Sequence, residues 1–222
     1  MPGKQYTGGG VYLSIVGGKL RQKVDEGTEG AVLRKYETPT GVKGEKWELV
    51  FESWSGIIQG LRINENDYGK FLEVKFEDAT LSIHTDSRYF GDFAKKLASA
   101  DITKEITVRP YDFEDDNKNK VTGVTLTQDG KKLVDYFYDF KEKKQLHDFP
   151  KSGHTKAKPF GKDDWKMYFL EVKKFLEAYL MLNIEPKIVK EAEPEEESAE
   201  DAINIEMPSD IDVQKELAQV KF

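Results

Sequence analysis

The sequence predicts a mostly β fold. Apolar side chains alternate with charged ones from Trp47 to Phe51 and again from Leu72 to Phe76, and a two-residue period runs through most of residues 11–138. This period is typical of antiparallel strands with one buried and one solvated face. Short clusters of Gly, Pro, Asp and Asn separate the periodic segments, as in Asp129-Gly130, and mark turns between strands. With 38% hydrophobic and 12% aromatic residues, the chain has enough apolar material for a core.

The elements follow in order after a glycine-rich flexible leader at residues 1–10. One helix is expected to interrupt the strands, from Arg88 to about Ala98, because Phe90, Phe93, Ala94 and Leu97 recur on one helical face. Besides the two alternating stretches above, strands are expected at Val11–Val16, Ala31–Tyr36, Gly56–Ile63, Thr80–His84, Glu105–Tyr111, Val121–Thr127 and Leu133–Tyr138.

Strands on both sides of one helix favour a small barrel. The five-stranded oligonucleotide-binding (OB) architecture carries a helix between its third and fourth strands, and the element order here fits it with a few strands to spare. The predicted fold is therefore an OB-like antiparallel barrel with extra strands, one inserted helix and a C-terminal helix.

The chain changes character after Phe140. Residues 141–162 are rich in lysine and contain two prolines and two glycines, which predicts an exposed basic loop. A second helix follows at residues 163–183, with Asp163 or Asp164 as N-cap, and closes a domain spanning residues 11–185. We expect its aromatic stripe to be buried on the barrel, with a dimer interface as the alternative. The stripe comprises Trp165, Tyr168, Phe169, Val172, Phe175, Leu176 and Tyr179.

The acidic residues are concentrated at the C-terminus. The first 190 residues carry 30 acidic and 32 basic side chains, a net charge of +2, whereas the last 32 carry 11 acidic and two basic side chains, a net charge of −9. Residues 186–222 contain no aromatic residue before Phe222, so this segment is predicted to be a disordered acidic tail. Such charge asymmetry suggests a nucleic-acid partner or an interaction tail.

Catalytic and metal-binding signatures are missing from the sequence. There is no cysteine, and the three histidines match no zinc spacing. No phosphate-binding loop or nucleophile elbow is present. We therefore expect a binding protein, not an enzyme, with no cofactor or metal. The absence of cysteine and of long apolar runs favours the cytoplasm and excludes a membrane role.

Basic and aromatic residues are interleaved along the predicted strands. Proteins that hold single-stranded nucleic acid combine cations that follow the phosphates with aromatic rings on which bases stack. This pattern selects candidate DNA-binding residues at Arg34, Lys35, Tyr36, Lys46, Trp54, Arg62, Arg109, Tyr111, Lys143 and Lys144.

The chain resembles the single-stranded DNA-binding proteins of bacteriophages, which join one OB domain to an acidic tail ending in an aromatic residue. The resemblance is carried by Glu191–Asp212 and Phe222, and in the body by Gly56–Leu61, Tyr68-Gly69 and Val108–Tyr111. It implies that the protein coats single-stranded DNA during phage replication or recombination in the host cytoplasm. It also implies that the tail recruits a polymerase, helicase or primase. The candidate tail contacts are Glu195, Glu196, Glu197, Asp201 and Phe222.

Two other functions remain open at this stage. A structural or adaptor protein would bind other proteins through its β domain and form oligomers through the second helix. An RNA-binding protein would use the same stacking platform, and only its response to the 2′-hydroxyl would separate it from a DNA-binding one. The sequence leaves the oligomeric state undetermined.

Overall fold

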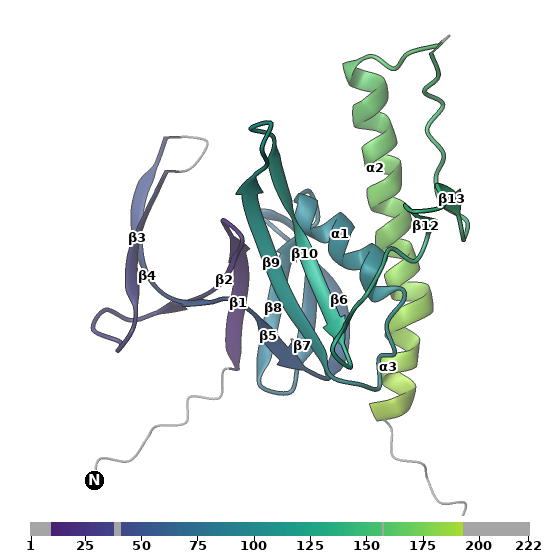
Figure 1. Cartoon of the computed structure of the whole chain (residues 1–222). Coiled ribbons are helices and arrows are strands. Elements are labelled where there is room, and N and C mark those ends of the chain that lie inside the picture. The colour runs from purple at the N-terminus through teal and green to yellow at the C-terminus, as the bar shows by residue number, and fades with distance from the viewer. Residues whose placement is uncertain (1–9, 38–40, 157, 193–222) are drawn as a thin grey trace, which may run out of the picture. The chain divides into compact units, whose positions relative to one another are not determined.

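A computed structural model describes residues 10–37, 41–156 and 158–192 of the chain. It confirms a mostly β protein, with a seven-stranded sheet, a four-stranded sheet and a small hairpin (Figure 1). The strands are β1 Val11–Val16, β2 Lys19–Val24, β3 Val32–Glu37, β4 Lys43–Phe51, β5 Trp54–Gly56, β6 Ile58–Asn66, β7 Gly69–Phe76, β8 Ala79–His84, β9 Ile106–Glu114, β10 Lys120–Gln128, β11 Lys131–Lys132, β12 Tyr138–Asp139 and β13 Lys144–Gln145. The helices are α1 Arg88–Leu97, α2 Lys162–Tyr179, η1 Leu180–Ile184 and α3 Glu185–Ala192.

The larger sheet has the strand order β3-β4-β2-β1-β8-β7-β6. Strands β1 and β8 pair in parallel, in register from Val11 with Ala79 to Ser14 with Ser82. The sheet is therefore mixed: this pair departs from the predicted antiparallel pairing, whereas its other strand pairs are antiparallel. The reason is that the chain enters β1 beside a strand formed much later in the sequence, a pairing that a local two-residue period does not encode.

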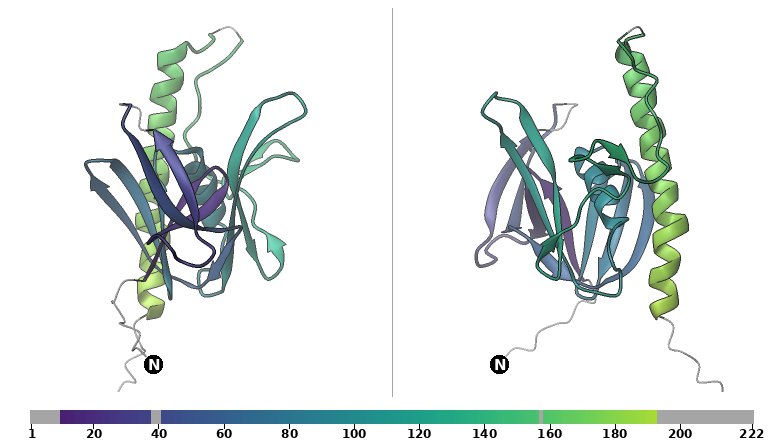
Figure 2. Two further views of the ribbon diagram at one scale, coloured as in Figure 1. Left: turned by 90° about the vertical axis from the view of Figure 1, so that its left-hand side faces the viewer. Right: turned by 45° about the vertical axis from the view of Figure 1, so that its right-hand side comes forward.

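The two sheets are joined by one nearly continuous strand. Residues 54–56 form β5, which pairs with β9 in the four-stranded sheet β11-β10-β9-β5. Only Ile57 intervenes before β6, which pairs with β7 in the larger sheet. The strand thus bends from one sheet into the other, and the apolar inner faces of both sheets belong to one core with Leu72, Val74 and Val108 fully buried. Figure 2 shows the two sheets from the side.

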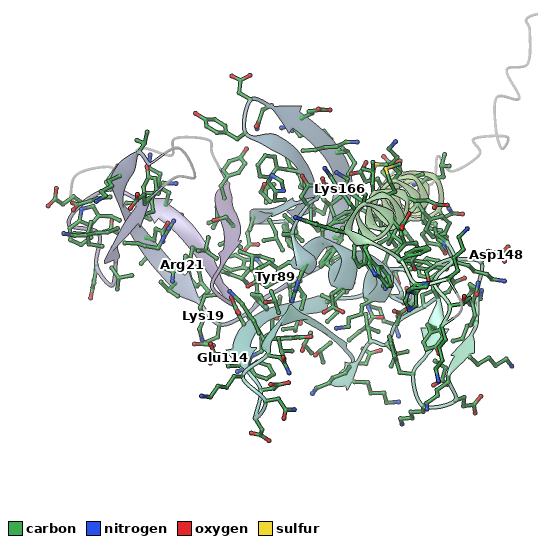
Figure 3. The ribbon with its side chains drawn as sticks, turned by 90° about the horizontal axis from the view of Figure 1, so that it is seen from above. Lys19, Arg21, Tyr89, Glu114, Asp148 and Lys166 are labelled. Atoms are coloured by element: carbon green, nitrogen blue, oxygen red, sulfur yellow. The ribbon has the colours of Figure 1, made fainter. Side chains whose placement is uncertain are left out.

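The β1–β2 turn makes a second junction between the sheets. Gly18 has a φ of +71°, and a β-carbon there would lie 2.5 Å from the backbone nitrogen of Asp112 in β9. Its own N–H donates a 2.9 Å hydrogen bond to the buried Tyr89 hydroxyl of α1. Only glycine satisfies both the backbone conformation and the close approach. Figure 3 shows Tyr89 and Lys19 where these elements meet.

Helix α1, between β8 and β9, confirms the inserted helix predicted from Arg88 to about Ala98. Ser87 caps its N-terminus by accepting from the Phe90 N–H, which satisfies one of the helix's free donors. Phe90, Phe93 and Leu97 are fully buried on one face, as the helical spacing of these residues predicted.

The C-terminal helix is longer than the sequence predicted. It begins at Lys162 with Gly161 as N-cap, and Asp164 lies in the first turn, where it accepts the Gly161 N–H at 2.9 Å. It continues through a π-helical segment and α3 to Ala192. Residues 186–192 are therefore helical and not part of a tail, because Ile184 and Ile188 bury their side chains on the core beside β6. In the described part of the chain, no helix is long and apolar enough to cross a membrane.

Only the second half of the predicted aromatic stripe packs on the core. Leu176 is buried in α2, and Val172, Phe175 and Tyr179 contact the core. By contrast, Phe169 is 60% exposed, so the expectation that the whole stripe is buried is wrong. The first turns of α2 extend past the sheets and contact residues 149–161 instead, through Phe160 and Pro150.

Several strand assignments also differ. Residues 133–137 are irregular and not a strand, because Asp135 accepts the backbone N–H groups of Phe137 and Tyr138 in a turn that drops Phe137 into the core. Strand β2, Lys19–Val24, was not predicted. Its alternation is weak because polar side chains occupy most of both faces.

Candidate nucleic-acid interface

The outer face of the β9–β10 hairpin forms a groove of about 650 Å³. Cross-strand pairing opposes Arg109 with Thr125 and Tyr111 with Gly123, and residues two apart point to the same face. The groove is lined by Ser53, Thr107, Arg109, Tyr111, Phe113, Val121, Thr125, Thr127 and Lys132. None of these residues is acidic.

Cations and aromatic rings share this groove. Arg109 and Lys132 are exposed and form no ion pair with any described residue. Tyr111 and Phe113 lie together with their ring centroids 5.8 Å apart, and Phe113 is 54% exposed. The groove therefore offers positive charge, flat apolar surface and threonine hydroxyls in one place, which are the groups that bind phosphates, bases and sugars.

Tyr111 is held in a fixed position. Its hydroxyl passes over Gly123 and donates to the Asp92 carboxylate of α1 at 3.4 Å. Burial, together with the Asp92 charge, raises the pKa of the Tyr111 hydroxyl above its ordinary value, so the hydroxyl remains a donor at neutral pH. Because Gly123 has no side chain, the tip of the ring can lie close to the strand.

Asp92 also connects the groove to α1. The same carboxylate oxygen accepts the Val124 N–H at 2.7 Å, and Lys96, which pairs with Asp92 at 2.8 Å, donates to the Val124 carbonyl. These contacts satisfy backbone groups on the edge of β10, which would otherwise be open to another strand. The aromatic ring of the groove is thus anchored to a helix packed on the core.

A Gly123→Ala substitution is expected to lower the free energy of unfolding by about 1–3 kcal/mol, because the added carbon overlaps the Tyr111 hydroxyl. Urea unfolding measures this loss. Gly60→Ala is the matched control, since a β-carbon there meets only Lys75 at 3.8 Å, an ordinary contact. Equal losses at the two glycines would contradict the proposed crowding under Tyr111.

No family model, curated protein or solved structure matches this chain.

The predicted binding residues do not converge on one surface. Arg109 and Tyr111 lie in the groove described above. Strand pairing places Arg34, Tyr36, Lys46 and Arg62 on the outer face of the seven-stranded sheet. Most of these cations are already engaged. Lys46 lies 4.8 Å from the centre of the Tyr36 ring, and Arg62 pairs with Glu73 at 2.5 Å.

Arg34 has a structural partner. Its Nε and Nη2 atoms each donate to Glu48 at 2.7 Å, and Arg21 pairs with the same carboxylate at 3.1 Å. Burial opposes the ionisation of Glu48, but the two guanidinium groups outweigh it and hold the pKa of Glu48 below its ordinary value. A guanidinium whose donor fork is occupied in this way is poorly placed to hold a phosphate.

The remaining candidates lie elsewhere. Trp54 packs against the core and donates to Asp78 at 3.3 Å, so it does not line the groove. Lys35 points to the opposite face from Arg34 and pairs with Glu45. Lys143 and Lys144 belong to the β12–β13 hairpin, outside both large sheets. The predicted partner contacts Glu195, Glu196, Glu197, Asp201 and Phe222 lie outside the described residues.

Phe113, Lys132 and the threonines of the groove were not among the predicted binding residues. The signal was present, because Thr107, Arg109, Tyr111 and Phe113 alternate with the core residues of β9. With Val108 in the core, strand parity puts all four of these side chains on the solvent face.

Proposed function

We propose that this protein binds single-stranded DNA without sequence preference, through the outer face of β9 and β10. It is not an enzyme in this proposal. It acts as a coating protein in phage DNA replication or recombination in the host cytoplasm.

One observation carries the proposal. The groove joins two cations, Arg109 and Lys132, to the adjacent rings of Tyr111 and Phe113, with no acidic residue in its lining. Stacking of a base on an aromatic side chain contributes about 1–3 kcal/mol and tolerates any base. Contacts from cations to the phosphates add affinity that falls with salt. Both contributions are independent of sequence.

The order of the elements also supports an OB-like architecture. Strands β5 and β6 form one bent strand shared by two sheets, strands β7 and β8 follow it, and α1 separates β8 from β9. An OB barrel has the same order, with its helix between the third and fourth strands.

The acidic tail has two roles in the proposal. It competes with DNA for the basic groove, since a tethered anion can reach an effective concentration in the millimolar range. DNA binding then frees the tail, with Glu195, Glu196, Glu197, Asp201 and Phe222, to recruit a polymerase, helicase or primase.

An adaptor function is the second candidate. It is favoured by the apolar surface that α2 leaves exposed, which includes Met167 and Phe169, 64% and 60% accessible. Exposed apolar patches of this kind often mark protein contacts.

The deciding experiment is fluorescence anisotropy with labelled oligothymidine, comparing the full chain with residues 1–192, at low and moderate salt. The truncation follows Ala192 because α3 ends there. We expect salt-sensitive binding by both proteins and tighter binding by the truncated one.

The controls are a duplex and an oligouridine of equal length. Tighter binding to oligouridine would favour the RNA-binding function, and no binding by either protein at low salt would contradict the proposal in favour of the adaptor.

A further inference from the structure

Among the described residues, the first half of α2 has an exposed face. Asp163, Met167, Leu170 and Lys174 follow one another at spacings of four, three and four residues, and all four are exposed. This spacing places them in one stripe along the helix. The stripe lies opposite Leu176 and Leu180, which attach the helix to the core.

A groove runs beside this stripe. Its volume is about 510 Å³, and Met167, Leu170 and Lys174 line it together with Gly153 and Phe160 of the preceding segment. Met167 is 64% exposed and Leu170 36%. Covering water-exposed apolar side chains with a second surface lowers the free energy, because apolar area is removed from water.

The order of charges along the stripe is self-complementary. It reads acid, apolar, apolar, base from Asp163 to Lys174. When two copies of the helix lie antiparallel about a two-fold axis, Asp163 of one faces Lys174 of the other, and Met167 faces Leu170. Within the described part of the chain, neither Asp163 nor Lys174 forms an ion pair. A two-fold contact needs such a self-complementary patch.

We infer that α2 is the interface of a homodimer, in which the stripe of Asp163, Met167, Leu170 and Lys174 pairs antiparallel with the same stripe of a second copy. The contact extends over about three helical turns, which is at the small end of specific interfaces, so we expect a weak dimer. The inference is independent of DNA binding.

Sedimentation velocity of the full chain without DNA, from about 1 to 100 µM, tests this inference. The wild type is expected to shift from monomer to dimer across this range. Met167→Ser/Leu170→Ser is expected to remain monomeric. Leu182→Ser is the matched control because Leu182 is 75% exposed in η1, outside the stripe, and it should dimerise like the wild type.

A charge exchange identifies the geometry. Asp163→Lys alone and Lys174→Asp alone are each expected to weaken dimerisation several-fold, by placing like charges face to face. The double variant restores opposite charges across the two-fold axis and should recover dimerisation. A wild type that stays monomeric, a Met167/Leu170 variant that still dimerises, or a double variant that fails to recover would each overturn the inference.

Discussion

Replacing Arg109 and Phe113 together with alanine is expected to weaken binding to oligothymidine by about 100- to 1,000-fold. Phe113 supplies stacking surface worth about 1–3 kcal/mol per base. Arg109 supplies a charge-assisted hydrogen bond worth about 1.5–3 kcal/mol. Both side chains are exposed on the outer face of β9, so the variant should fold normally. Fluorescence anisotropy measures the affinity, and urea unfolding checks the stability.

The salt dependence separates the two contributions. Loss of one phosphate contact lowers the slope of log affinity against log salt by about 0.7 for a single strand. We expect Arg109→Ala to reduce the slope and Phe113→Ala to leave it unchanged while lowering affinity. This difference would distinguish a stacking surface from an electrostatic one.

A matched pair on the other sheet is the control. Tyr68 is 86% exposed and the Arg62 side chain 71% exposed, near the outer face of the seven-stranded sheet. Tyr68→Ala/Arg62→Ala removes an aromatic ring and a guanidinium of the same kinds. If this variant lost the binding and the Arg109/Phe113 variant kept it, the DNA site would lie on the larger sheet.

Local pattern predicted most of the secondary structure. Ser87 and the spacing from Phe90 to Leu97 encode α1 within a short local segment, and the alternation from Ile106 to Pro110 encodes β9. The parallel pairing of β1 with β8 was not predictable, because it joins segments that lie more than 60 residues apart. The local sequence pattern of each segment does not specify which strand it pairs with.

The candidate site was predicted only in part, for a related reason. The sequence selects residue types, so Arg34 and Arg109 looked equivalent. The structure separates them, because a buried carboxylate from β4 faces Arg34 whereas threonine faces Arg109. Partners contributed by neighbouring strands decide which cations remain free for a ligand.

Strand parity misled the interpretation at Trp47 and Glu48. The alternation predicts that Trp47 points to the core and Glu48 to solvent. In the structure Trp47 is only half-buried, since β4 extends past the core at this point, and Glu48 is 3% exposed beneath its two arginines. The two-residue period predicts one buried face and one solvent-exposed face. The ion cluster of Glu48 with Arg21 and Arg34 is an exception, because it buries a carboxylate on the outer face.

Glu48→Gln is expected to lower the free energy of unfolding by about 2–4 kcal/mol at neutral pH, because it leaves Arg21 and Arg34 beside a neutral group in a partly buried cluster. Urea unfolding at several pH values measures the loss. The matched control is Glu45→Gln on the same strand, whose carboxylate is 56% exposed and pairs with Lys35. An exposed pair contributes at most about 1 kcal/mol, so the control should lose little.

The stability that Glu48 contributes depends on pH, because folding lowers the pKa of its carboxyl group. The folded pKa of Glu48 lies below its ordinary value of 4.5, so folding favours the ionised carboxylate. The stabilisation is complete above pH 4.5 and disappears as the pH falls through the lower folded pKa. The gap in stability between wild type and Glu48→Gln should therefore narrow on acidification, whereas a gap that stayed constant or widened would show that Glu48 stabilises the fold by packing and not by charge.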